Sequence, residues 1–132
     1  MIRAAVLATA LVLAGTAHAA SVGTYCGELA SNGHMDPAET TIIRDDAGNL
    51  SGSYQFTDDG QTYRGDLSRG TMTSKGTWHF TWTDNFGMGQ LDIRFNSDAS
   101  AFDGLWGADK DTPNLPWYGK LGESCLDGAP ST

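Results

Sequence analysis

The chain has 132 residues, which suffices for one domain. Sixteen acidic residues against eight basic ones give a net charge of −8, so the chain lacks the basic surface that nucleic acids and anionic membranes require. Seventeen glycines favour many tight turns over long helices. The composition therefore argues against nucleic-acid and membrane partners and is compatible with a basic protein or a cationic ligand.

Residues 1–19 contain the parts of a secretory signal peptide in the right order. Arg3 supplies the positive start, residues 4–13 form a short apolar run, and Ala17-His18-Ala19 is a small-x-small cleavage site. The run is too short to span a bilayer, and a buried N-terminal helix is the weaker alternative. We expect a secreted or periplasmic protein, not embedded in a membrane, whose mature residues 20–132 form a single domain.

Export changes the interpretation of the two cysteines, Cys26 and Cys125, which both remain in the mature chain. An even number of cysteines in an oxidising compartment predicts a disulfide. A redox or metal pair is less favoured, because the chain has no Cys-x-x-Cys motif.

The mature chain then alternates period-two segments with turn signals, which is the pattern of short strands. The predicted strands cover residues 23–30, 39–44, 50–56, 61–67, 74–83, 90–95, 101–107 and 115–121. The fifth is the clearest, because Trp78, Phe80 and Trp82 share one face. Residues 108–114 form the only long connection.

Eight short antiparallel strands joined by hairpins predict an all-β, up-and-down barrel, with a β-sandwich as the alternative. Closure would make the first and last strands neighbours. Cys26 lies in the first strand and Cys125 just after the last, so their disulfide would pin the closing seam.

Three segments resemble strands of avidin-type proteins in order and spacing: Gly23-Thr24-Tyr25, Gly48-Asn49-Leu50-Ser51-Gly52-Ser53-Tyr54 and Trp78-His79-Phe80-Thr81-Trp82. The resemblance to this avidin and lipocalin-like group of secreted barrels implies the architecture and carries over no binding residue. Phe102-x-Gly104-x-Trp106-Gly107, followed by Trp117-x-Gly119, also resembles a pattern of uncharacterised secreted bacterial proteins and implies no activity.

Aromatic side chains are the main candidates for ligand binding, since thirteen occur in so small a domain. They could fill the barrel interior, or some could line a cavity at a barrel mouth. The candidate set is Tyr54, Trp78, Trp82, Trp106, Trp117 and Tyr118.

Catalytic and metal chemistry have weaker support. His79 lies opposite the tryptophans on its strand, where a solvent-facing position is favoured over a functional one. Asp109 and Asp111 offer oxygens suited to calcium, although a solvated loop is favoured. No serine-nucleophile motif occurs. We therefore expect no catalytic residue, no cofactor and no metal, and leave calcium binding by this loop open.

Two functions remain. The first is a non-enzymatic carrier of a small apolar or aromatic ligand. The second is a protein-binding module, such as an inhibitor of a basic exported enzyme, which the mature charge of −9 left after loss of Arg3 would attract. The sequence identifies neither the ligand nor the protein target, and it marks no interface between copies.

Overall fold

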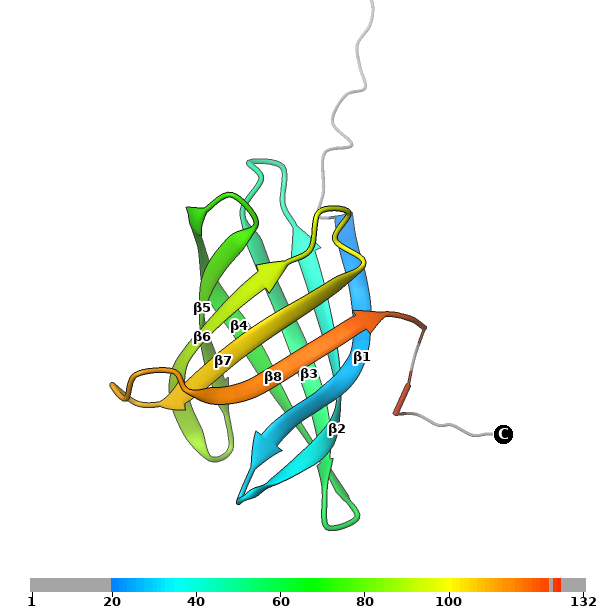
Figure 1. Cartoon of the computed structure of the whole chain (residues 1–132), viewed down its shortest axis with the longest axis vertical. Coiled ribbons are helices and arrows are strands. Elements are labelled where there is room, and N and C mark those ends of the chain that lie inside the picture. The colour runs from blue at the N-terminus through cyan, green and yellow to red at the C-terminus, as the bar shows by residue number, and fades with distance from the viewer. Residues whose placement is uncertain (1–19, 124, 127–132) are drawn as a thin grey trace, which may run out of the picture.

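A computed structural model describes residues 20–123, 125 and 126, and Figure 1 shows their arrangement. These residues form eight strands: β1 (Ala20–Ser31), β2 (His34–Arg44), β3 (Leu50–Asp58), β4 (Gln61–Ser74), β5 (Thr77–Asp84), β6 (Gly87–Phe95), β7 (Ala101–Ala108) and β8 (Leu115–Leu121). Residues 1–19, where the signal peptide is predicted, lie outside the described part. Within that part, no helix is long and apolar enough to cross a bilayer.

The strands form a closed antiparallel barrel in which each strand pairs with the next along the chain. β1 also pairs with β8, with Tyr25 opposite Leu121 and Leu29 opposite Trp117. The predicted up-and-down barrel is confirmed, and the sandwich alternative is excluded.

Alternation along the strands separates an inner from an outer face. Trp78, Phe80 and Trp82 face the interior together, as predicted, and Phe80 is completely buried. The two barrel ends differ, so we name them. The packed end carries the β2–β3, β4–β5 and β6–β7 turns. The mouth, toward the lower left of Figure 1, carries the β1–β2, β3–β4, β5–β6 and β7–β8 connections.

Two strands are clearly longer than predicted: β4 continues to Ser74 and does not end at residue 67, and β2 begins at His34 and not at residue 39. Asn32 and Gly33 form the preceding two-residue turn with φ values of 53° and 83°. Both values are positive, as in a type I′ hairpin, which favours Asn-Gly. This tight turn places His34 and Asp36 in a strand at the mouth.

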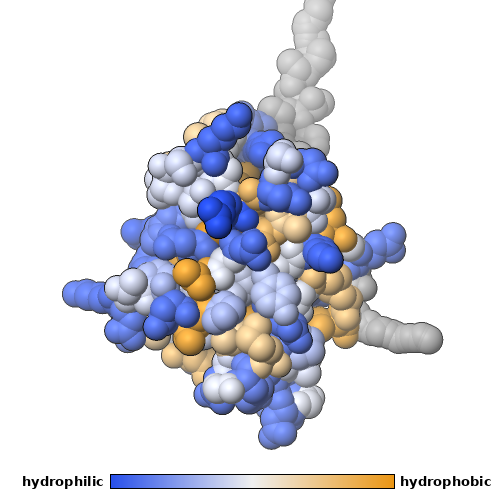
Figure 2. All heavy atoms as spheres, in the orientation of Figure 1, coloured by the Kyte–Doolittle hydropathy of each residue, from blue (hydrophilic) through white to orange (hydrophobic). Residues whose placement is uncertain are grey.

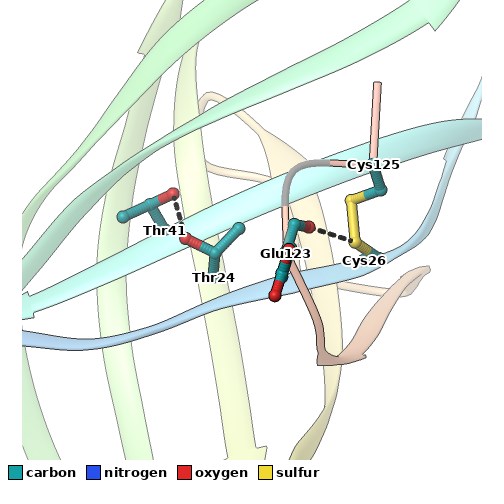
Figure 3. Close-up of a disulfide and its surroundings, with 5 residues drawn as sticks. All are labelled: Thr24, Cys26, Thr41, Glu123 and Cys125. Atoms are coloured by element: carbon teal, nitrogen blue, oxygen red, sulfur yellow. Dashed lines mark hydrogen bonds between the residues drawn. A yellow bond between two sulfur atoms is a disulfide. The ribbon is translucent and has the colours of Figure 1, made fainter. Parts of the chain in front are cut away.

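The disulfide between Cys26 and Cys125 is present, with a sequence separation of 99 and a Cα–Cα distance of 5.8 Å. Figure 3 shows that it ties β1 to the segment after β8, and the Glu123 carbonyl oxygen lies 3.1 Å from Cys26 Sγ. On the neighbouring strand pair, the hydroxyls of Thr24 and Thr41 are 3.2 Å apart. The cross-link therefore fastens the closing seam from outside the barrel.

Candidate functional site

A cavity of about 210 Å³ opens at the mouth. Its walls come from the mouth ends of β1, β3, β5, β7 and β8 and from two turns: Leu29, Ser31, Asn32, Tyr54, Phe56, Trp82, Asp84, Phe86, Trp106 and Trp117. Six of these ten side chains are aromatic, so the cavity offers mainly ring surfaces to a ligand.

The three indoles in the wall are held by hydrogen bonds that each reach past the adjacent strand to the next one around the barrel. Trp82 Nε1 donates to the Gly107 carbonyl at 2.9 Å, and Trp106 Nε1 donates to the Ala30 carbonyl at 3.0 Å. Trp117 Nε1 donates to the hydroxyl of Thr40, also at 3.0 Å. All three indole N–H groups are therefore used within the barrel.

Glycines on adjacent strands leave space for two rings of the cavity wall, those of Tyr54 and Trp82. A Cβ at Gly65 would lie 2.2 Å from the Tyr54 ring, and one at Gly89 would lie 2.7 Å from Trp82 Nε1. Both distances are shorter than van der Waals contact, so any larger residue would push the ring from its place. The rings of Tyr54 and Trp117 then meet edge to face, with centroids 4.8 Å apart.

Asp84 is the carboxylate of the cavity wall. The Tyr54 hydroxyl donates to its Oδ2 at 2.6 Å, and the Phe86 amide donates to its Oδ1 at 2.8 Å. Burial, followed by the hydrogen bond to Asp84, raises the pKa of Tyr54 above its ordinary value. The phenol therefore stays protonated and keeps Asp84 in place.

A second polar group lies at the same end, where β2 and β3 run side by side. His34 Nε2 is 3.0 Å from Asp36 Oδ1 and 3.1 Å from Asp58 Oδ1. The Asn32 side-chain amide donates to Asp58 Oδ2 at 3.0 Å, and Asn32 also lines the cavity. The mouth is thus acidic at its rim.

The charge states of this group reflect its surroundings. The hydrogen bond to Asp58 is the main cause that raises the pKa of His34. Burial, then the nearby charge of Asp58, raises the pKa of Asp36. Both shifts favour the proton-bound forms of these two side chains.

The structure brings four of the six predicted ligand-binding residues together around the cavity, namely Tyr54, Trp82, Trp106 and Trp117. Trp78 is on the inner face of the same strand as Trp82 but packs near Phe80, outside the cavity. Tyr118 is on the outer face and donates its hydroxyl to Glu28. That hydrogen bond raises the pKa of Tyr118.

The other residues singled out in the sequence lie away from the mouth cluster. His79 is on the outer face, with Nδ1 2.6 Å from Asp92 Oδ1 and Nε2 2.5 Å from Gln90 Oε1. Asp109 and Asp111 are exposed in the β7–β8 loop. Among the described residues, the group that brings three metal-ligating side chains together is His34, Asp36 and Asp58, and it includes neither loop aspartate.

Several wall residues carry no ligand-binding signal in the sequence. Asp84 and Phe86 lie between two predicted strands, and Leu29, Asn32 and Phe56 do not stand out from their surroundings. The Asn32-Gly33 pair was the available signal, because Asn-Gly is the strongest short hairpin signature. It would have placed the first hairpin at the mouth.

The outer face carries a wider groove of about 480 Å³ over β6, β7 and β8. Gly104 lines it, together with the exposed side chains of Leu105 and Tyr118 and with Asp92, Arg94 and Asp103. Figure 2 shows that hydrophilic atoms cover most of this side of the molecule, with hydrophobic patches between them.

Comparison with known protein families, curated proteins and solved structures finds no match to this chain. The arguments about function therefore start from the mouth itself.

Proposed function

We propose that the protein is an exported, non-enzymatic binding protein that holds a small aromatic or apolar ligand in the mouth of its barrel. The observation that carries the proposal is the cavity of about 210 Å³ whose rings are held in place by hydrogen bonds and given space by glycines. Barrel mouths are common ligand sites, and aromatic walls provide large contact areas.

The size and charge of the cavity narrow the ligand class. Its volume lies between about 150 Å³, which accommodates benzene, and about 300 Å³, where drug-sized pockets begin. The fitting ligand has one or two rings. Because Asp84 is in the wall and Asp36 and Asp58 lie at the same end, a neutral or cationic ligand is favoured over an anionic one.

The four tryptophans supply an internal test. In a two-dimensional amide NMR spectrum of the mature protein, titration with quinoline should shift the indole signals of Trp82, Trp106 and Trp117. The signal of Trp78 should stay in place, because that ring lies outside the cavity. Four equal shifts, or none at millimolar quinoline, would contradict the proposal.

A matched pair of variants sharpens this test. Phe86 and Met72 are both exposed, at 66% and 59%, but only Phe86 lines the cavity. Phe86→Ala should weaken quinoline binding about twofold to thirteenfold, because a lost ring contact contributes about 0.5–1.5 kcal/mol. Met72→Ala should leave the affinity unchanged. Equal affinities of the two variants would place the ligand elsewhere.

Native mass spectrometry of mature protein taken from its own compartment tests for a natural ligand. A co-purifying mass of a few hundred daltons supports the carrier. The alternative is a protein-binding module, which the outer groove and the net charge of −8 favour. That alternative predicts an empty protein that captures a basic exported enzyme at low salt and releases it at high salt.

A further inference from the structure

His34, Asp36 and Asp58 place three ligand atoms close together at the mouth. All three atoms lie within 4.8 Å of one another. His34 and Asp36 are on β2, on the same face because they are two residues apart, and Asp58 is at the end of the neighbouring strand β3. The positions are therefore set by the sheet and its tight Asn32-Gly33 hairpin.

The spacing matches a metal coordination shell. Zinc binds imidazole nitrogen and carboxylate oxygen at about 2.0–2.2 Å, so tetrahedral ligand atoms stand about 3.3–3.5 Å apart. His34 Nε2 lies 3.0 Å and 3.1 Å from the two carboxylate oxygens. A small expansion of the cluster would admit the ion.

Asp36 provides an independent reason to expect a ligand. Only 3% of this residue is exposed, and its Oδ2 is buried without a hydrogen-bond partner. A buried carboxylate oxygen without a partner is costly, since it has lost its water and gained nothing in return. A cation bound at this carboxylate would compensate for that loss.

We propose that this cluster binds one divalent transition-metal ion, with Zn²⁺ as the best fit. His34 Nε2 and one oxygen each from Asp36 and Asp58 are the protein ligands, and water completes the shell. One nitrogen and two oxygens suit zinc better than calcium, which takes six to eight oxygens. The His34 side chain is 53% exposed, so the ion can enter from solvent. The site does not depend on an organic ligand in the cavity.

Isothermal titration of the untagged, disulfide-bonded mature protein with Zn²⁺ alone tests this site after treatment with a chelator. We expect one equivalent to bind. His34→Ala should weaken binding at least tenfold, since loss of a residue that only hydrogen-bonds to a metal ligand already costs about 10–100-fold. His79→Ala is the matched control, because His79 also contacts a carboxylate but on the outer face. It should bind like the wild type.

Thermal unfolding covers the case in which a variant folds poorly. Zn²⁺ in excess should raise the Tm of the wild type and of His79→Ala, and it should leave the Tm of Asp36→Asn unchanged. Absence of stoichiometric binding to the wild type would overturn the proposal. It would mean that hydrogen bonds alone hold His34, Asp36 and Asp58 together. Equal loss of affinity in the His34 and His79 variants would equally overturn it, because it would indicate general binding to an acidic surface.

Discussion

The packed end and the mouth are built from the same eight strands and from the same kinds of residue, yet they use aromatic rings differently. At the packed end, Tyr25 and Phe80 are completely buried, and Tyr25 meets Phe102 edge to face with centroids 5.3 Å apart. At the mouth, Trp82 and Trp106 also meet edge to face, at 5.4 Å, but they border a cavity.

The difference lies in what holds each ring. Phe80 and Phe102 carry no polar atom, so contact with other side chains sets their positions and the interior fills. Tyr25 differs from them, because its hydroxyl also donates to the Ala99 carbonyl at 2.8 Å. Trp82 and Trp106 donate to backbone carbonyls of other strands, and Gly89 leaves Trp82 its space. Rings anchored in this way keep their positions without further packing. A small barrel can therefore hold a cavity at one end while the other end supplies the stability.

Substitution of one phenylalanine at each end provides the largest expected effect. Phe80→Ala should lower the free energy of unfolding by about 3–5 kcal/mol, because it leaves a void in a filled core. Phe86→Ala should lower it less, by about 0.5–1.5 kcal/mol, because the ring is exposed and its main contact is the edge-to-face pair with Tyr63, with centroids 4.9 Å apart. Urea unfolding followed by circular dichroism measures both. Similar losses would mean that the mouth is part of the stabilising core.

Removal of the disulfide is the next largest effect. The double variant Cys26→Ser and Cys125→Ser should lose about 2–5 kcal/mol, because the unfolded chain gains the freedom of a 99-residue loop. Amide hydrogen exchange then compares the two ends. Protection should fall most at the Tyr25–Leu121 pair beside the bridge and less at the Leu29–Trp117 pair of the mouth. Equal losses would show that the seam opens as one unit.

Local patterns predicted much of the barrel. Alternation identified all eight strands and the inner face of β5, and the two cysteines indicated the seam. Alternation also separates Trp117 from Tyr118, which are neighbours on one strand and must point to opposite faces. By this rule, Trp117 and Tyr118 cannot both line the cavity, and the predicted binding set that contains both does not satisfy it.

The distribution of residues between the two ends could not be read locally. Trp78 and Trp82 share a face but are four residues apart, which is about 13 Å along a strand. Only the closed sheet shows that one of them lines the mouth. Similarly, Asp36 and Asp58 are far apart in sequence, and their meeting depends on the register of β2 against β3, where Ala38 pairs with Phe56.

The two ends also differ in their response to pH. In turns at the packed end, hydrogen bonds from the backbone amide of Asn49 and from the side chain of Ser100 are the main causes that lower the pKa of Asp45 and of Asp98. Lowered carboxylate pKa values stabilise the fold above their ordinary value of 3.8, and that contribution disappears as the pH falls through the folded values. A fall in pH should therefore destabilise the turns of the packed end first.

A rise in pH should destabilise the mouth, which is the opposite direction. We expect this effect on stability to be smaller than those of the phenylalanine substitutions and of disulfide removal. The pKa of His34 is raised, so its contribution is complete below the ordinary value of 6.5 and is lost as the pH rises through the folded value. The pKa of Asp36 is also raised, so its contribution to stability is complete below the ordinary value of 3.8 and is lost as the pH rises through the folded value. In chelator, the Tm of the wild type should decrease between pH 6 and 8.5, and His34→Ala should show a smaller decrease. If His34→Ala keeps the wild-type slope, the mouth cluster contributes nothing to pH-dependent stability.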